Sequence, residues 1–576
     1  MLRTTSFENT EKDHSLLDIE SSMKKIKKLF LTNQGLFLVI ILSCFPLIDL
    51  LNSGLPVTHD GTDHVARIAN FYNALKDGVI FPRWGEYLNW GYGHPVMMFL
   101  YPFSSYFASL FHLFGFSYVD SLKLVFASGY IASGITMYLW AKKQFNDYFA
   151  VSSAVLYLYA PYRFVDMYVR GAIGEHMAFI FPPVILLFIL LLFESKKRKK
   201  YLYGIGLAIS TCLLLLSHNA ISLMFLPIFA GYIFYLSLKH KDYRSLSLAA
   251  IGILYGFILS SFFTIPAFLE GKFTLRDIVT GDEYKKRFVD PISLLYGKWS
   301  YGITGQFSVQ IGIIHLIGVI TSFIFLASKK VRKLTGLVWL MFVCFVFSLF
   351  IMTSYSSPIY DIVTIFKKFQ FPWRFLTLTV FTSSVFASGI FLVIKKDKLA
   401  KVLVFFIILG SLATTFTFWH AKEYKTVSDD FYNNVYYGTT DTGESAPIWS
   451  VRFMEKEADF HAEIIEGSGN IQEISRTSVR HEYFVTAQSE RVRIRENTLY
   501  FPGWSVRVNG KETEVQFQDP NNRGLITYYV PKGQNNVVIQ FYDTKLRILS
   551  NSVSVFGFLI IIVGCVFLYI KHGKKN

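Results

Sequence analysis

Acidic and imidazole side chains gather in a short segment that follows the first strongly apolar run of the chain. Its members include His59, Asp60, Thr62, Asp63 and His64. A carboxylate in such a group can accept a proton from an acceptor hydroxyl, and carboxylates also hold divalent cations. Capping of a helix that starts here explains one of these residues, but it leaves the two histidines and Asp60 unexplained. We therefore take Asp60 as a candidate general base.

A second polar segment, loop two (163–176), carries two arginines and an acid. The forked donors of Arg163 and Arg170 match the oxygens of a phosphate. Glu175 opens the next apolar run, where the helix dipole favours a carboxylate by only about 0.3–1 kcal/mol. An acid drawn toward hydrocarbon costs several times that amount, so a functional role and a dipole role for Glu175 both stay open.

Three further polar residues, His218, Glu270 and Arg374, lie at the ends of apolar runs. A lone histidine in a core is usually only hydrogen-bonded there, but His218 lies level with the other polar residues once the spans are placed. Arg374, in the stretch Phe371–Phe375, opposes the bias of arginine toward the inner side of a membrane. Snorkelling to headgroups is one explanation, and an anionic substrate such as a lipid phosphate is the other.

The elements that position these residues are predicted to be membrane helices. The 576-residue chain is 52% hydrophobic and contains 57 Phe, which is too apolar for a soluble multidomain protein. Its net charge of +16 does not indicate nucleic acid, because Lys and Arg cluster in short loops between apolar runs, where they set topology and meet lipid headgroups. The four cysteines lie inside apolar runs and offer neither a disulfide framework nor metal-ligand spacing.

Basic clusters between the apolar runs allow the chain to be threaded through a membrane. A crossing needs about 20 apolar residues, and basic short loops stay in the cytoplasm, so an even number of crossings must separate two basic clusters. This predicts twelve spans, at about 33–52, 120–141, 147–162, 177–194, 201–218, 221–238, 246–266, 307–328, 334–352, 375–394, 401–419 and 550–570. The apolar run 95–114 would break the parity, and we expect it to dip into the membrane as part of loop one (about 53–118). The polar residues named above then lie at the outer face.

Four parts follow from this threading. Residues 1–32 are predicted to be a disordered cytoplasmic N-terminus, 33–419 a transmembrane domain, and 549–576 the last helix with a basic cytoplasmic tail. The polar stretch 420–548 alternates apolar and polar residues between turn signals, as in Ser505–Val508, which predicts an extracytoplasmic β-sandwich-like domain. The predicted fold class is a polytopic α-helical membrane protein with a β-rich domain before its last helix.

Several motifs occur in an order that resembles a known family. They are His59-Asp60 leading to His64 and Arg67, Phe81-Pro82-Arg83-Trp84, Gly91-Tyr92-Gly93-His94-Pro95, Tyr101-Pro102, Arg170-Gly171-Ala172 with Glu175, Ser217-His218-Asn219 and Phe371-Pro372-Trp373-Arg374-Phe375. The ordered set resembles bacterial GT-C-type membrane glycosyltransferases, and among them the group labelled 6-pyruvoyl-tetrahydropterin synthase-related, a label that does not name an activity. Phe501–Trp504 and Val508–Gly510 are similar to the β-domain of related lipoteichoic-acid-modifying glycosyltransferases.

The resemblance implies a GT-C-like fold in the bacterial cell membrane and a polyprenyl-phosphate sugar as the donor. It also implies an essential Asp in loop one, which matches Asp60. Many relatives have a second acid directly after it, whereas this chain has Gly61. Asp63 takes that second role or none, which leaves metal dependence open. If a divalent cation such as Mg or Mn is bound, its candidate ligands are Asp60, Asp63 and Glu175.

On this resemblance, we expect transfer of a sugar to a cell-envelope acceptor on the outer face, with inversion of the anomeric carbon and Asp60 as the base. The acceptor would be a glycan, a lipid or a teichoic acid. The expected substrate-binding residues are His59, Asp63, His64, Arg163, Arg170, Glu175, His218, Glu270 and Arg374. The residues expected to stack on sugar rings are Trp84, Tyr92 and Tyr101.

Two other classes stay open. A lipid or polysaccharide transporter or flippase would place its site near the bilayer midplane, at the interface of repeats with broken helices. A cell-envelope scaffold would need only the β-rich domain and would leave loops one and two unexplained. Because the polar residues gather on one face and no internal repeat is evident, the sequence favours the enzyme.

Overall fold

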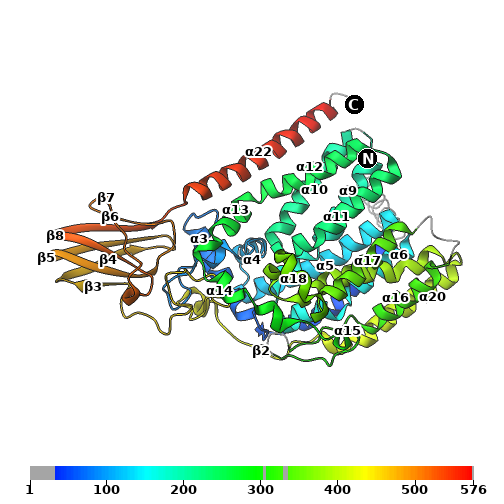
Figure 1. The fold of residues 1–576 in the computed structure, drawn as a ribbon, viewed down its shortest axis with the longest axis horizontal. Helices are drawn as coiled ribbons and strands as arrows, with labels where there is room; N and C mark the ends of the chain where they lie inside the picture. Colours follow the sequence, from blue (N-terminus) through cyan, green and yellow to red (C-terminus); the bar gives the residue numbers. More distant parts are fainter. Residues whose placement is uncertain (1–32, 197, 303–305, 329–334, 574–576) are drawn as a thin grey trace, which may run out of the picture.

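The computed structural model describes residues 33–573, apart from residue 197, residues 303–305 and residues 329–334. Helices form a bundle that holds most of the chain, and a β-domain projects from one end of it (Figure 1). The last helix, α22 (Lys545–Gly573), slants back along the outside of the bundle. The predictions for residues 1–32 and for the end of the basic tail lie outside the described residues.

One set of helices follows the predicted spans closely. They are α2 (Gln34–Cys44), α5 (Tyr118–Gln144), α6 (Asp147–Leu158), α9 (Phe181–Glu194), α10 (Arg198–Ser217), α11 (Asn219–His240), α12 (Tyr243–Leu259), α16 (Ile313–Leu326), α17 (Gly336–Ile351), α19 (Leu376–Ala387), α20 (Asp397–Thr415) and α22. The other helices lie mainly between them, namely α3 (Gly61–Lys76), α4 (Phe103–Leu113), α7 (Pro161–Phe164), α8 (Ile173–Ala178), α13 (Ser261–Leu269), α14 (Arg276–Thr280), α15 (Pro291–Leu295), α18 (Ser357–Ile362) and α21 (Asp429–Asn433). Each predicted span thus corresponds to a helix.

Length and composition qualify fewer helices as complete spans than the twelve predicted. In the described part of the chain, eight continuous helical stretches are long and apolar enough to cross a membrane, or up to ten if two bent pairs each count as one. The pairs are Tyr243–Leu259 with Ser261–Phe273, bent by 71°, and Gly336–Ile351 with Ser354–Ile362, bent by 92°. The two predicted spans that remain correspond to the shorter apolar helices α6 and α16. The polytopic helical fold is confirmed, and the count of twelve stays a prediction.

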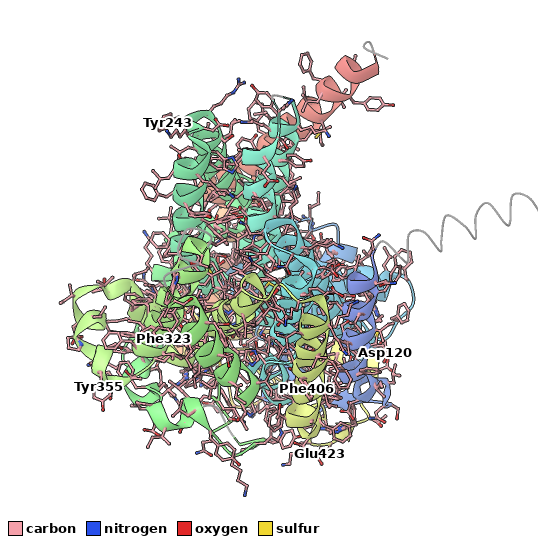
Figure 2. All side chains as sticks on the ribbon, turned by 90° about the vertical axis from the view of Figure 1, so that its right-hand side faces the viewer. Asp120, Tyr243, Phe323, Tyr355, Phe406 and Glu423 are labelled. Atoms are coloured by element: carbon pink, nitrogen blue, oxygen red, sulfur yellow. The ribbon has the colours of Figure 1, made fainter. Side chains whose placement is uncertain are left out.

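The outer surface of the bundle is apolar. Large hydrophobic side chains cover it, among them Phe323 of α16 and Phe406 of α20 (Figure 2), which are 43% and 60% exposed. A helix that is apolar on its outward face as well as on its packed face is typical of a membrane span.

Loop one contains an irregular stretch where the sequence predicted a dip into the membrane. A 3-10 turn at Pro95–Met98 leads into α4, which has 11 residues. A helix of that length is about 16 Å long, which is too short for a hydrocarbon core of about 30 Å. The two prolines of this stretch, Pro95 and Pro102, lack the N–H groups that a continuous helix would need.

The predicted β-domain is one six-stranded antiparallel sheet with the strand order β3-β5-β8-β6-β7 and with β4 also paired to β5. Its strands are β3 (Ala462–Glu466), β4 (Gly469–Arg476), β5 (Arg480–Leu499), β6 (Trp504–Val508), β7 (Lys511–Thr513) and β8 (Leu525–Phe541). Register shifts, as between Ala487 and Arg491, interrupt the long β5–β8 ladder. Inward-facing residues from both halves of that ladder, such as Val485 and Ile494, share one apolar core. A short ladder of β1 (Leu55–Pro56) with β2 (Tyr424–Lys425) ties loop one to the segment after α20.

Buried charges fasten the β-domain to loop one. Arg476 Nε donates to Glu86 Oε1 at 2.8 Å, and Trp84 Nε1 donates to Glu86 Oε2 at 3.0 Å. Arg476 Nη1 and His481 Nδ1 both reach Glu496 Oε1, at 3.0 and 2.8 Å. Burial tends to raise the pKa of Glu86, but Arg476 and His481 outweigh it and lower that pKa to about 2. Burial tends to lower the pKa of His481, but the two flanking carboxylates raise it. The junction is therefore charged, buried and internally compensated.

A second junction fixes the start of α22. Arg547 Nε donates to Glu270 Oε2 at 2.8 Å, and both side chains are buried. Arg83 of loop one donates to Asp543 Oδ1 at 3.1 Å and to Asn551 Oδ1 at 2.6 Å. The β-domain is thus held at β4 and β5 by the first junction, and just after β8, at the start of α22, by the second.

Candidate functional site

Loop one and loop two meet backbone to backbone. The N–H groups of His59 and Asp60 donate to the carbonyls of Val169 and Arg170, each at 2.9 Å. Asp60 is also the N-cap residue of α3. Its side chain is exposed, and among the described residues its carboxylate has no hydrogen-bond or ion-pair partner. The two loops therefore fix the backbone of Asp60 and leave its carboxylate available to a substrate.

Gly171 makes this close approach of the two loops feasible. It ends the π-helical turn Val165–Arg170 with a φ of +69°, a conformation that glycine adopts without steric penalty. A Cβ at this position would lie 2.4 Å from Thr58 Oγ1 and 3.3 Å from the backbone N of Gly61. Any larger residue would push loop one away from loop two.

Arg170 is the centre of a buried network. Its Nη1 donates to Asp166 Oδ1 at 2.7 Å, to Glu175 Oε2 at 2.8 Å and to Tyr162 Oη at 2.9 Å. Tyr162 Oη in turn donates to Glu175 Oε1 at 2.7 Å. Two carboxylates therefore already neutralise Arg170, and Glu175 holds it in place.

Arg374 lies next to this network without a carboxylate partner of its own. Thr377 Oγ1, one helical turn further on, donates to Glu175 Oε1 at 2.7 Å. Arg374 Nη1 donates to the carbonyl of Phe369 at 2.9 Å, which orients the guanidinium. Within the described residues Arg374 forms no ion pair, and its Nε is buried without a hydrogen-bond partner. It is the uncompensated cation of this group.

Tyr101 of loop one reaches the same group. Its ring stacks on His218 with the centroids 4.7 Å apart, and a Cβ on Gly174 would lie 1.8 Å from the Tyr101 ring. Burial raises the pKa of Tyr101, and the charges of Arg374 and Arg67 oppose that rise. The predicted residues Tyr101, His218 and Arg374 are thus brought together.

Phe307 joins three of the segments, although its sequence context gave no reason to choose it. Its ring centroid is 6.1 Å from that of His59 and 5.4 Å from that of Trp373. The Arg170 guanidinium carbon lies 5.9 Å from the same centroid. An apolar residue in an irregular loop has no polar marker in the sequence, so this contact was missed.

The segment after α20 also reaches the site, although no motif in its sequence marks it. Tyr436 Oη donates to Asp63 Oδ1 at 2.7 Å. Arg67 Nε donates to Thr440 Oγ1 at 3.2 Å, and Arg67 Nη2 also donates to the Thr440 carbonyl. We call residues 434–446 the linker. It covers α3, the helix that Asp60 caps.

The linker adds two acids to this part of the molecule. Asp441 accepts the N–H groups of Gly443 and Ser445 at 2.8 and 3.1 Å. Burial and then Asp441 raise the pKa of Glu444, while Arg276 and Arg374 oppose the rise. The positive charge of Arg374 therefore acts on Glu444. In the sequence both acids look like ordinary solvated loop residues.

Burial favours the neutral form of the imidazoles of His59 and His64. Burial lowers the pKa of His59 below 6.5, and it lowers the pKa of His64 well below that value, helped by Arg67. Burial also raises the pKa of Asp63, against the hydrogen bond from Tyr436. Neutral imidazoles can each donate and accept one hydrogen bond, which suits the hydroxyl groups of a sugar.

Several buried polar atoms in the segments that meet here have no hydrogen-bond partner among the described residues. They are Thr58 Oγ1, His59 Nε2, His64 Nε2, Asn219 Oδ1, Arg374 Nε and Ser445 Oγ. Leaving such an atom unpaired costs about 1–3 kcal/mol, and folded proteins pair most of them. The atoms come from loop one, the α10–α11 junction, the turn before α19 and the linker. This arrangement is suited to a polar ligand.

The structure places four predicted site residues elsewhere. Arg163 is fully buried, donates to Ser133 Oγ at 3.0 Å and lies 3.9 Å from the centroid of the Phe179 ring. Glu270 pairs with Arg547 at the start of α22, and Trp84 packs against the β-domain residues Trp504 and Phe541. The carbonyl of Tyr92 accepts the N–H of Leu499, again at the β-domain. In the described contacts these residues support the fold around the site.

The predicted cation ligands are mostly occupied by other partners. Both Glu175 oxygens accept hydrogen bonds, from Tyr162 and Thr377 on Oε1 and from Arg170 on Oε2. Within the described ranges, no group of three or more His, Cys, Asp or Glu side chains converges as a metal site would require. These side chains do not fit a divalent cation.

A family model described as "6-pyruvoyl-tetrahydropterin synthase related domain; membrane protein" matches residues 98–420, which is more than half of the chain. Among curated proteins, an uncharacterized protein of Lactococcus lactis subsp. cremoris (strain MG1363) is 23% identical over 333 residues. The alignment covers 55% of this chain and 51% of the relative, so the chain spans about half the length of that protein.

Solved structures give partial likenesses. The apo oligosaccharyltransferase of Archaeoglobus fulgidus is similar with a TM-score of 0.46 and 14% identity, over 73% of this chain and 61% of that one. Arabinofuranosyltransferase AftD from Mycobacteria gives a TM-score of 0.42 and 13% identity, over 67% and 26%. ArnT from Cupriavidus metallidurans, bound to undecaprenyl phosphate, gives 0.29 and 11%, over 66% and 78%. Scores of this size assign neither a fold nor an activity.

Proposed function

We propose, from the premise that this chain belongs to the family of membrane proteins described as 6-pyruvoyl-tetrahydropterin synthase related, that it is a membrane glycosyltransferase. The donor is a polyprenyl-phosphate sugar, and the acceptor is a cell-envelope glycan, lipid or teichoic acid. The family membership makes it a multi-pass membrane protein.

The observation that carries the proposal is a free carboxylate and an uncompensated guanidinium in one polar group. The backbone N–H of Asp60 donates a hydrogen bond to the carbonyl of Arg170, and the Arg170 side chain pairs with Glu175. Glu175 also accepts a hydrogen bond from Thr377, which lies one helical turn after Arg374. A base for a hydroxyl and a cation for a leaving phosphate are the two groups that direct displacement at a phosphorylated sugar needs.

In the proposed step, an acceptor hydroxyl oxygen attacks the anomeric carbon, and its proton passes to an Asp60 carboxylate oxygen. The bond between the anomeric carbon and the phosphate oxygen breaks, and the electron pair leaves with the polyprenyl phosphate. Attack from the face opposite the leaving group inverts the anomeric carbon. Arg374 stabilises the negative charge that develops on the phosphate, and the neutral imidazoles of His59 and His64 hydrogen-bond sugar hydroxyls.

The same proposal gives the protein an orientation. Basic side chains such as Lys199 and Lys200 lie at the start of α10, whereas His218 follows its end beside the site. Because basic loops stay in the cytoplasm, the end of the bundle that carries Asp60, together with the β-domain, faces the outside of a bacterial cell membrane. An outward-facing site near the helix ends agrees with an enzyme better than with a transporter, whose site would lie near mid-length.

The test is sugar transfer by the full-length protein in lipid vesicles, from a panel of labelled polyprenyl-phosphate sugars. Asp60→Asn should lower the transfer rate about 100- to 10,000-fold, because a general base contributes about that factor. Asp459→Asn, at an exposed acid ahead of β3, is the matched control and should leave the rate unchanged. Full transfer by folded Asp60→Asn would disprove the base, and a folded wild type that transfers and hydrolyses none of the donors would count against the enzyme itself.

A further inference from the structure

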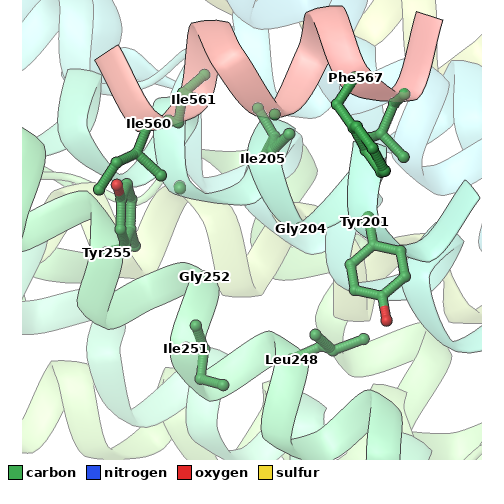
Figure 3. Close-up of a pocket in the computed structure, with 13 residues that line it drawn as sticks. Tyr201, Gly204, Ile205, Leu248, Ile251, Gly252, Tyr255, Ile560, Ile561 and Phe567 are labelled. Carbon is green, nitrogen blue, oxygen red and sulfur yellow. The ribbon is translucent and has the colours of Figure 1, made fainter. Parts of the chain in front are cut away.

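A large apolar groove lies between the last helix and two helices of the bundle. Its volume is about 780 Å³, which falls in the range of about 300–1,000 Å³ that is usual for ligand sites. Tyr201 and Ile205 of α10, Ile251 and Tyr255 of α12, and Phe567 of α22 are among its lining residues (Figure 3). Hydrocarbon side chains make up most of its wall, so a hydrocarbon chain is the ligand that fits it.

The groove begins where the polar tethers of α22 stop. Arg547 pairs with Glu270, the N–H of Phe262 donates to Ser554 Oγ at 2.8 Å, and Tyr255 Oη donates to the carbonyl of Gly557 at 3.0 Å. These contacts hold the first half of α22 against α12 and α13. The helix slants along the outside of the bundle (Figure 1), and its residues between Ile560 and Leu568 form one wall of the groove.

Two glycines keep the groove open. Gly204 of α10 and Gly564 of α22 line it, and a Cβ built on either meets no heavy atom within 4 Å. Gly252 differs, because its Cβ would lie 2.9 Å from Leu207 Cδ2, so it serves the close packing of α10 on α12. Larger side chains at Gly204 and Gly564 would therefore fill the groove without disturbing the helix contacts.

Positive charge lies at the mouth of the groove, at the opposite end of the bundle from Asp60. Tyr201 is separated from His218 by about 25 Å along α10. Arg244 Nη2 donates to Tyr201 Oη at 2.6 Å. Arg244 is exposed and forms no ion pair within the described part of the chain, whereas Lys200 pairs with Asp242.

We propose that this groove binds an acyl chain of an anionic membrane phospholipid, with the headgroup phosphate at Arg244. The apolar wall accounts for the chain, and the unpaired Arg244 accounts for the preference for an anionic headgroup. The prenyl chain of a sugar donor is a poorer fit, because the cation that we assign to its phosphate, Arg374, lies at the other end of the helices. The bound lipid fills the space beside α22 and so steadies the helix that follows the β-domain.

The experiment titrates the lipid-depleted full-length protein in detergent with phosphatidylglycerol or with phosphatidylcholine of the same acyl chains, and follows the thermal midpoint by tryptophan fluorescence. We expect phosphatidylglycerol to raise the Tm of the wild type at a lower concentration than phosphatidylcholine. Each basic side chain near a lipid surface contributes about fivefold in affinity, so Arg244→Gln should raise the half-saturating phosphatidylglycerol concentration about fivefold. Gly204→Leu and Gly564→Leu should abolish the shift, because leucine occupies the groove.

Val343→Leu, at an exposed apolar position of α17, is the matched control and should keep the wild-type response. If a leucine variant does not fold, Gly204→Ala and Gly564→Ala, together with native mass spectrometry of retained lipid, replace it. An equal response to both phospholipids that Arg244→Gln leaves unchanged would overturn the headgroup site. A full response in folded leucine variants would overturn the groove. A stronger shift with polyprenyl phosphate that the glycine variants abolish would make the donor's prenyl chain the occupant and overturn the phospholipid.

Discussion

Replacing Arg374 with glutamine tests which cation meets the leaving phosphate. The three arginines that the sequence predicts as phosphate ligands have very different partners. Arg170 is neutralised by Asp166 and Glu175, and Arg163 is enclosed by aromatic rings. Arg374 alone of these three is oriented by a backbone carbonyl, at 2.9 Å, while keeping its charge uncompensated. Loss of one preorganised donor to a developing negative charge typically lowers kcat about 100- to 1,000-fold.

The variant should stay folded. It loses the hydrogen bond from Arg374 to the Phe369 carbonyl, and the loss of such a bond costs about 1 kcal/mol of unfolding free energy. The assay is the initial rate of sugar transfer in vesicles at saturating donor, beside a thermal melt of the same preparation. Arg507→Gln, at an exposed arginine of β6, is the control and should transfer at the wild-type rate. If folded Arg374→Gln keeps kcat within a few-fold of the wild type, the assignment of the phosphate to Arg374 is refuted.

The remaining predictions concern the joints around the site. Gly171→Ala should cost about 1–3 kcal/mol through its positive φ and its clash with Thr58, and it should lower transfer; an unchanged melt and rate would contradict the joint between loops one and two. Glu86→Gln should lower the unfolding free energy by about 3–5 kcal/mol, because it leaves two buried cations, Arg476 and His481, to share the carboxylate of Glu496. Glu490→Gln on the surface should change the denaturant midpoint little, and equal midpoints of the two variants would argue against the junction. The pKa of His481 is raised in the folded protein, so the stability that its charged form contributes is complete below the unfolded pKa of 6.5 and is lost as the pH rises through the folded pKa. The Tm should therefore fall less above pH 6.5 in His481→Gln than in the wild type. Parallel pH curves of the two proteins would disprove this role.

The positions of the helices could be predicted from the sequence because hydrophobic length and basic loops leave few alternatives. The sequence does not show whether the helix is continuous across each span. At Ser260, between α12 and α13, the helix pair is bent by 71°. Two adjacent serines within an apolar run do not predict such a bend. The irregular stretch around Pro95 was foreseen, since proline removes the helix donors that continuity requires.

The candidate site was predicted in part for a similar reason. Loop one and loop two were expected to share a face, and the backbone bonds of His59 and Asp60 to loop two bring them together. The sequence does not reveal which charges neutralise one another. Glu270 and Arg374 both end apolar runs, yet Glu270 finds Arg547 across the fold while Arg374 finds no acid within the described residues. Ion pairing is a property of the packed chain, so the uncompensated cation becomes evident only in three dimensions.

The linker has a consequence for how the protein is made. Arg67 of α3 depends on Thr440 for two hydrogen bonds, and Asp63 depends on Tyr436 for another. During synthesis α3 is completed long before the linker leaves the ribosome. A nascent chain therefore carries Asp60 to the membrane in an unfinished pocket, and the site closes only after α20 has been inserted. The hydrogen bonds that hold Asp63 and Arg67 therefore form only after most of the helical bundle has been synthesised.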